Sequence, residues 1–200
     1  MSIINDPYNR AALESSGLRQ KVRRLAENDL VKAYDLAKTI KHPWYRCQAL
    51  AMVAETVELL KLKTILQQSF ESAMQCHDEN RRVLVACWPL EVAIKREEPV
   101  LATSFLAECE KQINSDNDII SRWCCTSVVH VIKTDIALLN SFFETFSYAT
   151  SKGHGWRVER SIRSLIGDPA VQKDQRYIDH LLLRQTEIEK WKKENRNQNS

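Results

Sequence analysis

An aromatic residue recurs along this chain at a nearly constant interval. Ser-Phe pairs end at Phe70, Phe105 and Phe142, which are 35 and 37 residues apart, and Tyr34 stands 36 residues before Phe70. Each aromatic lies in a stretch rich in Leu, Ile and Ala, and each such stretch is followed by a polar linker and an arginine: Arg46, Arg82, Arg122 and Arg157. A repeat of about 36 residues is typical of stacked helical arrays. We expect the aromatic residues to be core residues, with the neighbouring serines packed closely beside them.

The composition favours long helices joined by short polar linkers. The 200 residues include only four Gly and five Pro, too few for the many tight turns of a β-rich protein. The net charge of +3 is small for a dedicated nucleic-acid binder. No apolar stretch approaches the length of about 18 residues that a membrane span needs, and the N-terminus shows no signal region. We therefore expect a cytoplasmic protein without a membrane segment.

Apolar residues recur at helical spacing along most of the chain, and this periodicity predicts about ten helices. Pro43 and Pro99 suit first helical turns, whereas Pro89 predicts a kink or an early helix end. The expected helices span residues 18–26, 30–40, 44–60, 62–76, 81–96, 99–113, 119–132, 136–149, 156–166 and 175–194. Because the second helices start at near-equal intervals, the predicted fold is a right-handed α-solenoid of about five antiparallel helix pairs.

The run Arg-Cys-Gln-Ala-Leu-Ala-Met-Val-Ala at residues 46–54 is the best match to the first helix of a solenoid repeat. By repeat length and helix-pair layout, residues 18–190 resemble the α-solenoid superfamily of tetratricopeptide and HEAT-type repeats. The tetratricopeptide pattern of Trp, Leu-Gly, Tyr, Ala, Phe and Pro is not met. The organisation expected is an N-terminal extension (1–17), one helical-repeat domain (18–194) and a disordered tail (195–200).

The repeated arginines and the tryptophans each have two interpretations. The arginines could form a ligand-binding ladder, or they could bind the free carbonyls at the end of the preceding helix, which we favour. Trp44, Trp88, Trp123 and Trp156 could form an aromatic strip with them, or they could be wedges between repeats, which we also favour.

Two basic clusters are candidates for an anionic partner. Arg157, Arg160 and Arg163 follow one helix face beside Trp156 and Lys152, and a second cluster near the other end contains Arg19, Lys21, Arg23 and Arg24. A solvated helix face is the simpler interpretation of both. The residues predicted to bind a partner are Trp156, Arg157, Arg160, Arg163, Arg122, Arg82, Arg46 and Trp44.

The sequence contains no signature of catalysis, of a cofactor or of a metal site. Cys76-His77 and Cys124-Cys125 with His130 lack the usual ligand spacings, so we expect the six cysteines to be buried free thiols. No nucleophile elbow or phosphate loop is present.

The leading hypothesis is a non-enzymatic adaptor whose helical-repeat surface grips a protein or peptide. The alternative is a nucleic-acid-binding HEAT-like protein that uses basic and Trp residues. It is similar in size and residue types to the HEAT-like alkylpurine DNA glycosylases, although no motif aligns. A small-molecule enzyme has no positive support. The partner, the concave face and the oligomeric state stay open.

Overall fold

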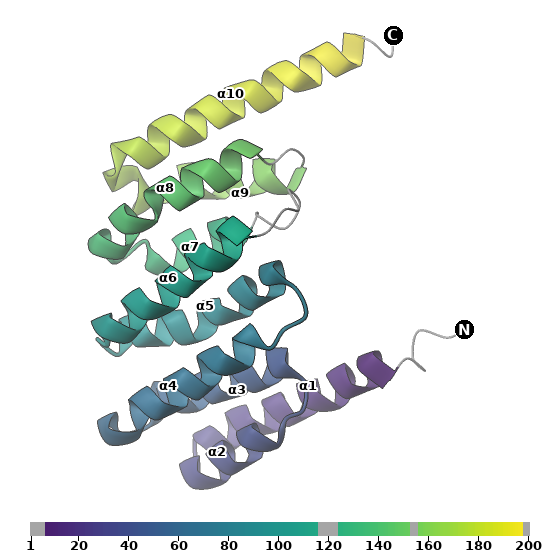
Figure 1. The fold of residues 1–200 in the computed structure, drawn as a ribbon, viewed down its shortest axis with the longest axis vertical. Helices are drawn as coiled ribbons and strands as arrows, with labels where there is room; N and C mark the ends of the chain where they lie inside the picture. Colours follow the sequence, from purple (N-terminus) through teal and green to yellow (C-terminus); the bar gives the residue numbers. More distant parts are fainter. Residues whose placement is uncertain (1–6, 116–123, 153–155, 198–200) are drawn as a thin grey trace. The chain divides into compact units, whose positions relative to one another are not determined.

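The computed structural model of the protein describes residues 7–115, 124–152 and 156–197 (Figure 1). Over these ranges the chain is all-helical and contains no strand, which confirms the predicted fold class. The helices are α1 (Pro7–Ala26), α2 (Leu30–Thr39), α3 (Pro43–Thr56), α4 (Leu59–Met74), α5 (Glu79–Lys95), α6 (Pro99–Ser115), α7 (Cys124–Ile132), α8 (Ile136–Lys152), α9 (Trp156–Ile166), the 3₁₀ helix η3 (Val171–Lys173) and α10 (Gln175–Asn197). None of the helices in the described ranges is long and apolar enough to cross a membrane.

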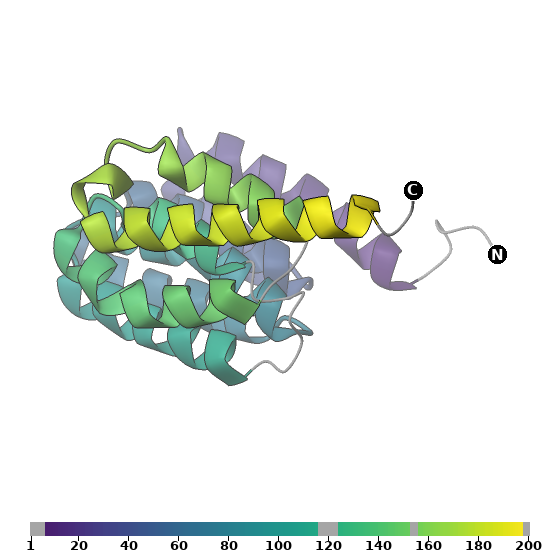
Figure 2. The same cartoon turned by 90° about the horizontal axis from the view of Figure 1, so that it is seen from above.

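The chain divides into two compact units, Met1–Cys109 and Glu110–Ser200, and α6 contributes to both. In the first unit α1, α3 and α5 pack side by side as one layer. The second layer begins with α2, which packs on α1 and α3, and continues with α4, which packs on α3 and α5 (Figure 1). In the second unit α10 runs alongside both α8 and α9 (Figure 2), and α7 contacts α8 and α9.

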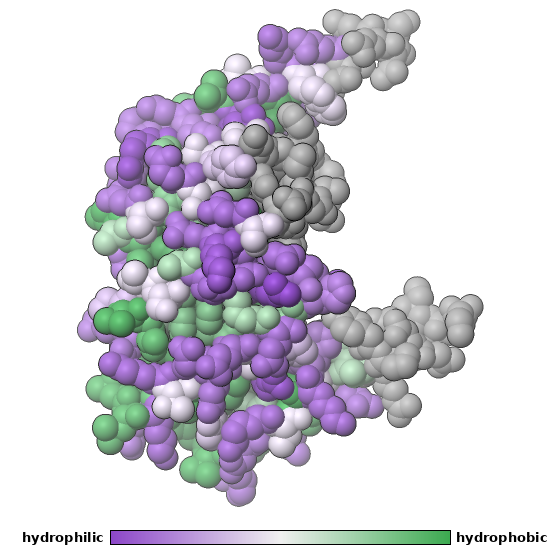
Figure 3. All heavy atoms as spheres, in the orientation of Figure 1, coloured by the Kyte–Doolittle hydropathy of each residue, from purple (hydrophilic) through white to green (hydrophobic). Residues whose placement is uncertain are grey.

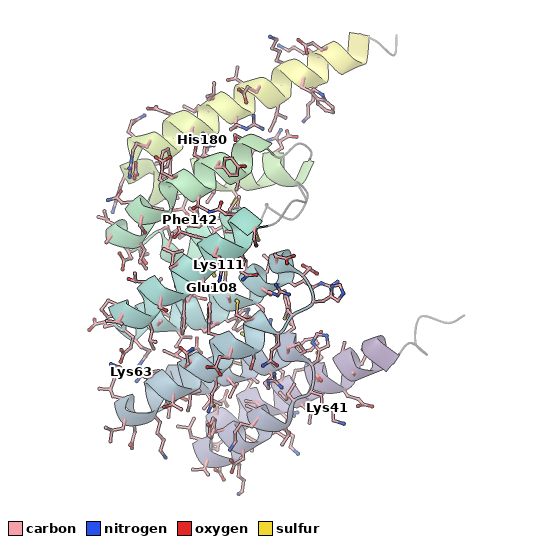
Figure 4. The ribbon with its side chains drawn as sticks, viewed as in Figure 1. Lys41, Lys63, Glu108, Lys111, Phe142 and His180 are labelled. Carbon is pink, nitrogen blue, oxygen red and sulfur yellow. The ribbon has the colours of Figure 1, made fainter. Side chains whose placement is uncertain are left out.

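The three repeated phenylalanines are core residues, as predicted, whereas Tyr34 is only half-buried. Phe70, Phe105 and Phe142 are buried (Figure 4 labels Phe142), and the rings of Phe70 and Phe105 stack with their centroids 4.2 Å apart and their planes 3° from parallel. The half-buried Tyr34 donates a hydrogen bond to Gln68 at 2.8 Å, from α2 to α4. In these two contacts the residues that touch are 35 and 34 positions apart, close to the interval seen in the sequence.

The expectation for the serines holds at only one of the three pairs. Ser69 is fully buried and donates to the carbonyl of Cys47 in α3 at 2.8 Å. Ser104 and Ser141 are exposed, so close packing does not explain their recurrence.

One predicted helix start is wrong, and one expectation at Pro89 is resolved. The helix expected over residues 18–26 begins at Pro7, and Ser15 in its added part is buried and accepts a hydrogen bond from the backbone N–H of His42. Of the two outcomes expected at Pro89, a kink or an early helix end, the early end does not occur, because α5 continues to Lys95. A proline cannot donate to the carbonyl four residues earlier, here that of Val85. The thiol of Cys47 in α3 donates to this carbonyl at 3.4 Å and so replaces the missing partner.

All six cysteines are buried and form no disulfide, as predicted. Burial raises the pKa of the Cys87 and Cys125 thiols to about 12, and of Cys76 to about 11. These side chains are therefore uncharged at neutral pH and behave as small apolar core residues.

Candidate functional site

Two of the repeated arginines bind carbonyls at the end of the preceding helix. Arg46 donates from Nη1 to the carbonyl of Ile40 at 3.5 Å and from Nε to Ser72 at 3.0 Å. Arg82 donates from Nε to the carbonyl of Cys76 at 2.9 Å and from Nη2 to that of His77 at 3.4 Å. Each reaches back over the same six residues, so the repeat places a cation where carbonyls at a helix end need a donor. This is the structural role that we favoured for the ladder.

The structure does not bring the other residues predicted to bind a partner together in one described cluster. Arg122 and Trp123 lie outside the described residues, as do the side chains of Trp156, Arg157 and Arg160. Arg163 in α9 is exposed and pairs with Glu159, which also binds Lys192 of α10. This bond from Lys192 is the main cause that lowers the pKa of Glu159.

Trp44 is half-buried in the first turn of α3. It belongs to the first unit with Arg46 and Arg82, and Arg163 belongs to the second.

Among the residues that the structure describes, Arg96, which the sequence pattern did not single out, makes the densest set of bonds to a helix end. It donates from Nη1 to the carbonyls of Ala54 at 2.9 Å and Glu55 at 2.8 Å, and from Nη2 to that of Val57 at 2.9 Å. These carbonyls end α3, whereas Arg96 follows α5. Its position after a helix, rather than near the start of one, is why the repeat pattern did not reveal it.

A surface pocket brings together three side chains from the layer of α1, α3 and α5. Arg23 comes from α1, Met52 from α3 and the half-buried Trp88 from α5, around a cavity of about 360 Å³. The remaining lining residues are Ala26, Glu27, Glu55 and Thr56. We call this the Trp88 pocket. Part of the indole stays exposed, so Trp88 can contact a partner as well as fill space between helices.

The Trp88 pocket carries charges of both signs. Arg23, Glu27 and Glu55 all line it, and within the described structure none of the three forms an ion pair. Exposed charges at the rim of an apolar floor can meet charges on a partner, although Glu55 also interacts electrostatically with Lys95.

The basic cluster predicted on α1 is divided between different surroundings. Arg23 lines the Trp88 pocket, whereas Arg19 donates to Gln48 at 2.8 Å and lies 5.7 Å above the centre of the Tyr45 ring. Lys21 and Arg24 are exposed and do not line the pocket. Four basic residues within six positions point around a helix rather than to one side of it, since each residue turns the chain by about 100°.

Within the described ranges two side-chain contacts join a serine to a histidine, and neither extends to a carboxylate. Ser164 Oγ lies 3.0 Å from His130 Nε2, and Ser147 Oγ lies 3.4 Å from His180 Nδ1. Burial is the main cause that lowers the pKa of both histidines. The nearby Asp168 bonds to Lys133 instead. No acid in the described residues orients either histidine as a nucleophilic triad requires. No group of three or more His, Cys, Asp or Glu side chains in those residues is arranged to hold a metal ion.

Comparisons with known proteins give no relative: no family model, no curated protein and no solved structure matches the chain.

Proposed function

We propose that the chain is a non-enzymatic binding protein, a right-handed α-solenoid of five antiparallel helix pairs that grips a protein or peptide through the exposed face of α1, α3 and α5. The observation that carries the proposal is the Trp88 pocket, where side chains of three adjacent helices meet at the surface. Contacts between residues 34 to 38 positions apart, such as Tyr34 with Gln68 and Cys47 with Val85, support the repeat organisation.

The residue types of the Trp88 pocket suit a binding hot spot. Trp, Arg and Met are enriched where protein interfaces bury their central side chains. The cavity has room for one large side chain, which would cover the exposed part of the Trp88 ring and the half-buried Met52. The pocket lining also includes one cation, Arg23, and two anions, Glu27 and Glu55. These charges favour a partner segment that carries an acidic and a basic residue beside the side chain that enters the pocket.

A peptide-display selection tests this proposal without knowledge of the natural partner. A phage library of random dodecapeptides is selected on the immobilised wild-type protein and counter-selected on the Trp88→Ala variant. We expect peptides with an aromatic or aliphatic anchor whose affinity, measured by fluorescence polarisation, falls at least about tenfold with Trp88→Ala, as for a hot-spot residue. Trp191→Ala is the matched control, since Trp191 is an exposed tryptophan of α10, and it should leave the affinity unchanged.

Equal affinity of the selected peptides for wild type and Trp88→Ala, in proteins with the same circular dichroism spectrum, would contradict the proposal. The Arg23→Glu variant adds a second readout. It should weaken peptides that carry an acidic residue beside the anchor and leave those without one unaffected, because only the former place a carboxylate against the guanidinium.

Nucleic-acid binding has less support from the described residues. Arg46 and Arg82 are bonded to carbonyls of their own chain, and the pocket that contains Trp88 is lined by two glutamates. Filter binding of duplex and single-stranded DNA at low salt distinguishes the alternatives. Binding that weakens steeply with salt and is lost with Trp88→Ala would replace the proposal with a nucleic-acid function.

A further inference from the structure

The first turn of α4 exposes two leucines between two residues of opposite charge. The chain reads Glu58-Leu59-Leu60-Lys61, and the side chain of Leu60 is 93% exposed and that of Leu59 65%. Glu58 and Lys61 are exposed as well, and neither joins an ion pair in the part of the chain that the structure describes. The neighbouring cations are neutralised, because Lys32 pairs with Asp29 and Lys63 with Glu98. In Figure 3 apolar surface gathers at this end of α4, at the lower left of the view.

An apolar pocket is lined in part by Lys61, the residue that follows these leucines in α4. It has a cavity volume of about 160 Å³ and is formed where the starts of α2 and α4 meet the end of α3. Its walls are Leu30, Val31, Tyr34, Val53, Val57, Lys61 and Ile65. Lys61 is the one charged residue among them, and the 67% exposed side chain of Val31 widens the apolar rim. The volume suits a single aliphatic side chain.

These features complement one another within the same small area. A projecting leucine lies beside a pocket of matching character, and an unpaired anion lies beside an unpaired cation. In an interface with two-fold symmetry the same patch occurs on both subunits, so that residue i meets residue j and residue j meets residue i. Leu60 of each copy then enters the apolar pocket of the other, and Glu58 of each copy meets Lys61.

We propose that this surface, centred on Leu60 and the adjoining pocket, is an isologous interface through which two copies of the chain associate. The charges argue for a second copy rather than for an acidic or basic partner, because Glu58 and Lys61 cancel and the nearby Lys32 and Lys63 are already paired. The surface lies apart from the Trp88 pocket in its lining residues, so it is independent of the proposed binding function.

The molecular mass in solution tests the interface. Sedimentation equilibrium is run from about 10 µM to about 1 mM, the range in which small interfaces associate. We expect the mass of the wild-type protein to rise from 23.2 kDa towards that of two chains and to stop there. Leu60→Ser should remain a monomer, whereas Leu13→Ser, at an exposed leucine of α1, should behave as wild type. A wild-type protein that stays monomeric throughout, or one that assembles beyond two chains, would overturn the proposal.

Charge reversal tests the pairing of Glu58 with Lys61 directly. Glu58→Lys and Lys61→Glu alone each place like charges opposite one another at two symmetric points, and each should raise the dimer dissociation constant at least about tenfold. The double variant Glu58→Lys/Lys61→Glu restores opposite charges and should dimerise within about threefold of wild type. A double variant whose dimer dissociation constant is as high as that of the single variants would contradict the proposed pairing of Glu58 with Lys61. Trp88→Ala should still dimerise, which separates this result from the peptide selection.

Discussion

Phe105 provides the most direct test of the repeat core. Its side chain is 1% exposed and its ring stacks on Phe70, with centroids 4.2 Å apart, so that Phe105→Ala removes a buried ring and leaves a cavity between α4 and α6. Emptying a core phenylalanine site costs about 3–5 kcal/mol of unfolding free energy, and the aromatic pair contributes about 0.5–1.5 kcal/mol of it. A loss of this size is a large part of the stability of a typical domain, about 5–15 kcal/mol.

Urea denaturation followed by far-ultraviolet circular dichroism measures this loss. With a slope of about 2–3 kcal/mol per molar urea, the midpoint should fall by about 1–2.5 M. Phe105→Leu should lose less than about 1.5 kcal/mol because it keeps most of the apolar volume. Val100→Ala in the same helix is the exposed control: its side chain is 78% exposed, and the change should stay within about 0.5 kcal/mol.

A double-mutant cycle with Phe70→Ala isolates the contact between the two rings. We expect a coupling energy of about 0.5–1.5 kcal/mol, because neighbours in contact do not behave additively. A near-zero loss for Phe105→Ala, or additive effects of the two substitutions, would refute the reasoning that residues one repeat apart form the core.

Three further predictions concern single positions. Glu97 has a φ of 55° at the end of α5, where the N–H of Glu98 donates to the carbonyl of Ala93. Glu97→Gly should relieve the left-handed strain and raise the unfolding free energy by about 0.5–1 kcal/mol in urea melts. An unchanged unfolding free energy would show that the position is unstrained. Tyr177 is fully buried and donates to the carbonyl of Leu139 at 2.8 Å, so Tyr177→Phe should cost about 1–2 kcal/mol in the same assay, and an unchanged stability would contradict the bond. Burial lowers the pKa of His180 from its usual 6.5; the charge of Arg184 adds to this effect and that of Glu187 opposes it. Below about pH 6.5 the unfolded chain therefore binds more protons than the folded chain, and the unfolding free energy should fall as the pH drops through that value. His180→Gln should show a smaller drop between about pH 7.5 and about pH 5.5, and an equal drop would exclude His180 as its source.

The helix class and the core followed from the sequence because they depend on local spacing. Apolar residues at helical intervals identify the buried face of each helix, and the interval near 36 residues singled out aromatic positions for the core. This predicted the buried Phe70, Phe105 and Phe142 and the buried cysteines. It also predicted the carbonyl-binding role of Arg46 and Arg82, because a position kept in register serves the repeat itself.

The sequence predicted only some residues of the candidate site. Trp88 and Arg23 were recognised as members of an aromatic set and a basic cluster, but the sequence could not show that they line one pocket with Met52. The residues predicted to bind a partner included Arg46 and Arg82. In the structure their side chains donate hydrogen bonds to carbonyls at the ends of helices. Residues that project from three different helices share a surface only when the packing of those helices brings them together.

By itself, then, the sequence determined an all-α chain with a repeat period, a set of buried aromatics and uncharged core thiols, since these need only the order of apolar and polar residues. The tertiary structure alone decided how polar groups are satisfied and which surface side chains meet. The thiol of Cys47 reaches across from α3 to the carbonyl that Pro89 leaves free, and Arg96 reaches three carbonyls at the end of α3. Such contacts join residues about 40 positions apart, and no local pattern encodes them, because each depends on how two helices pack.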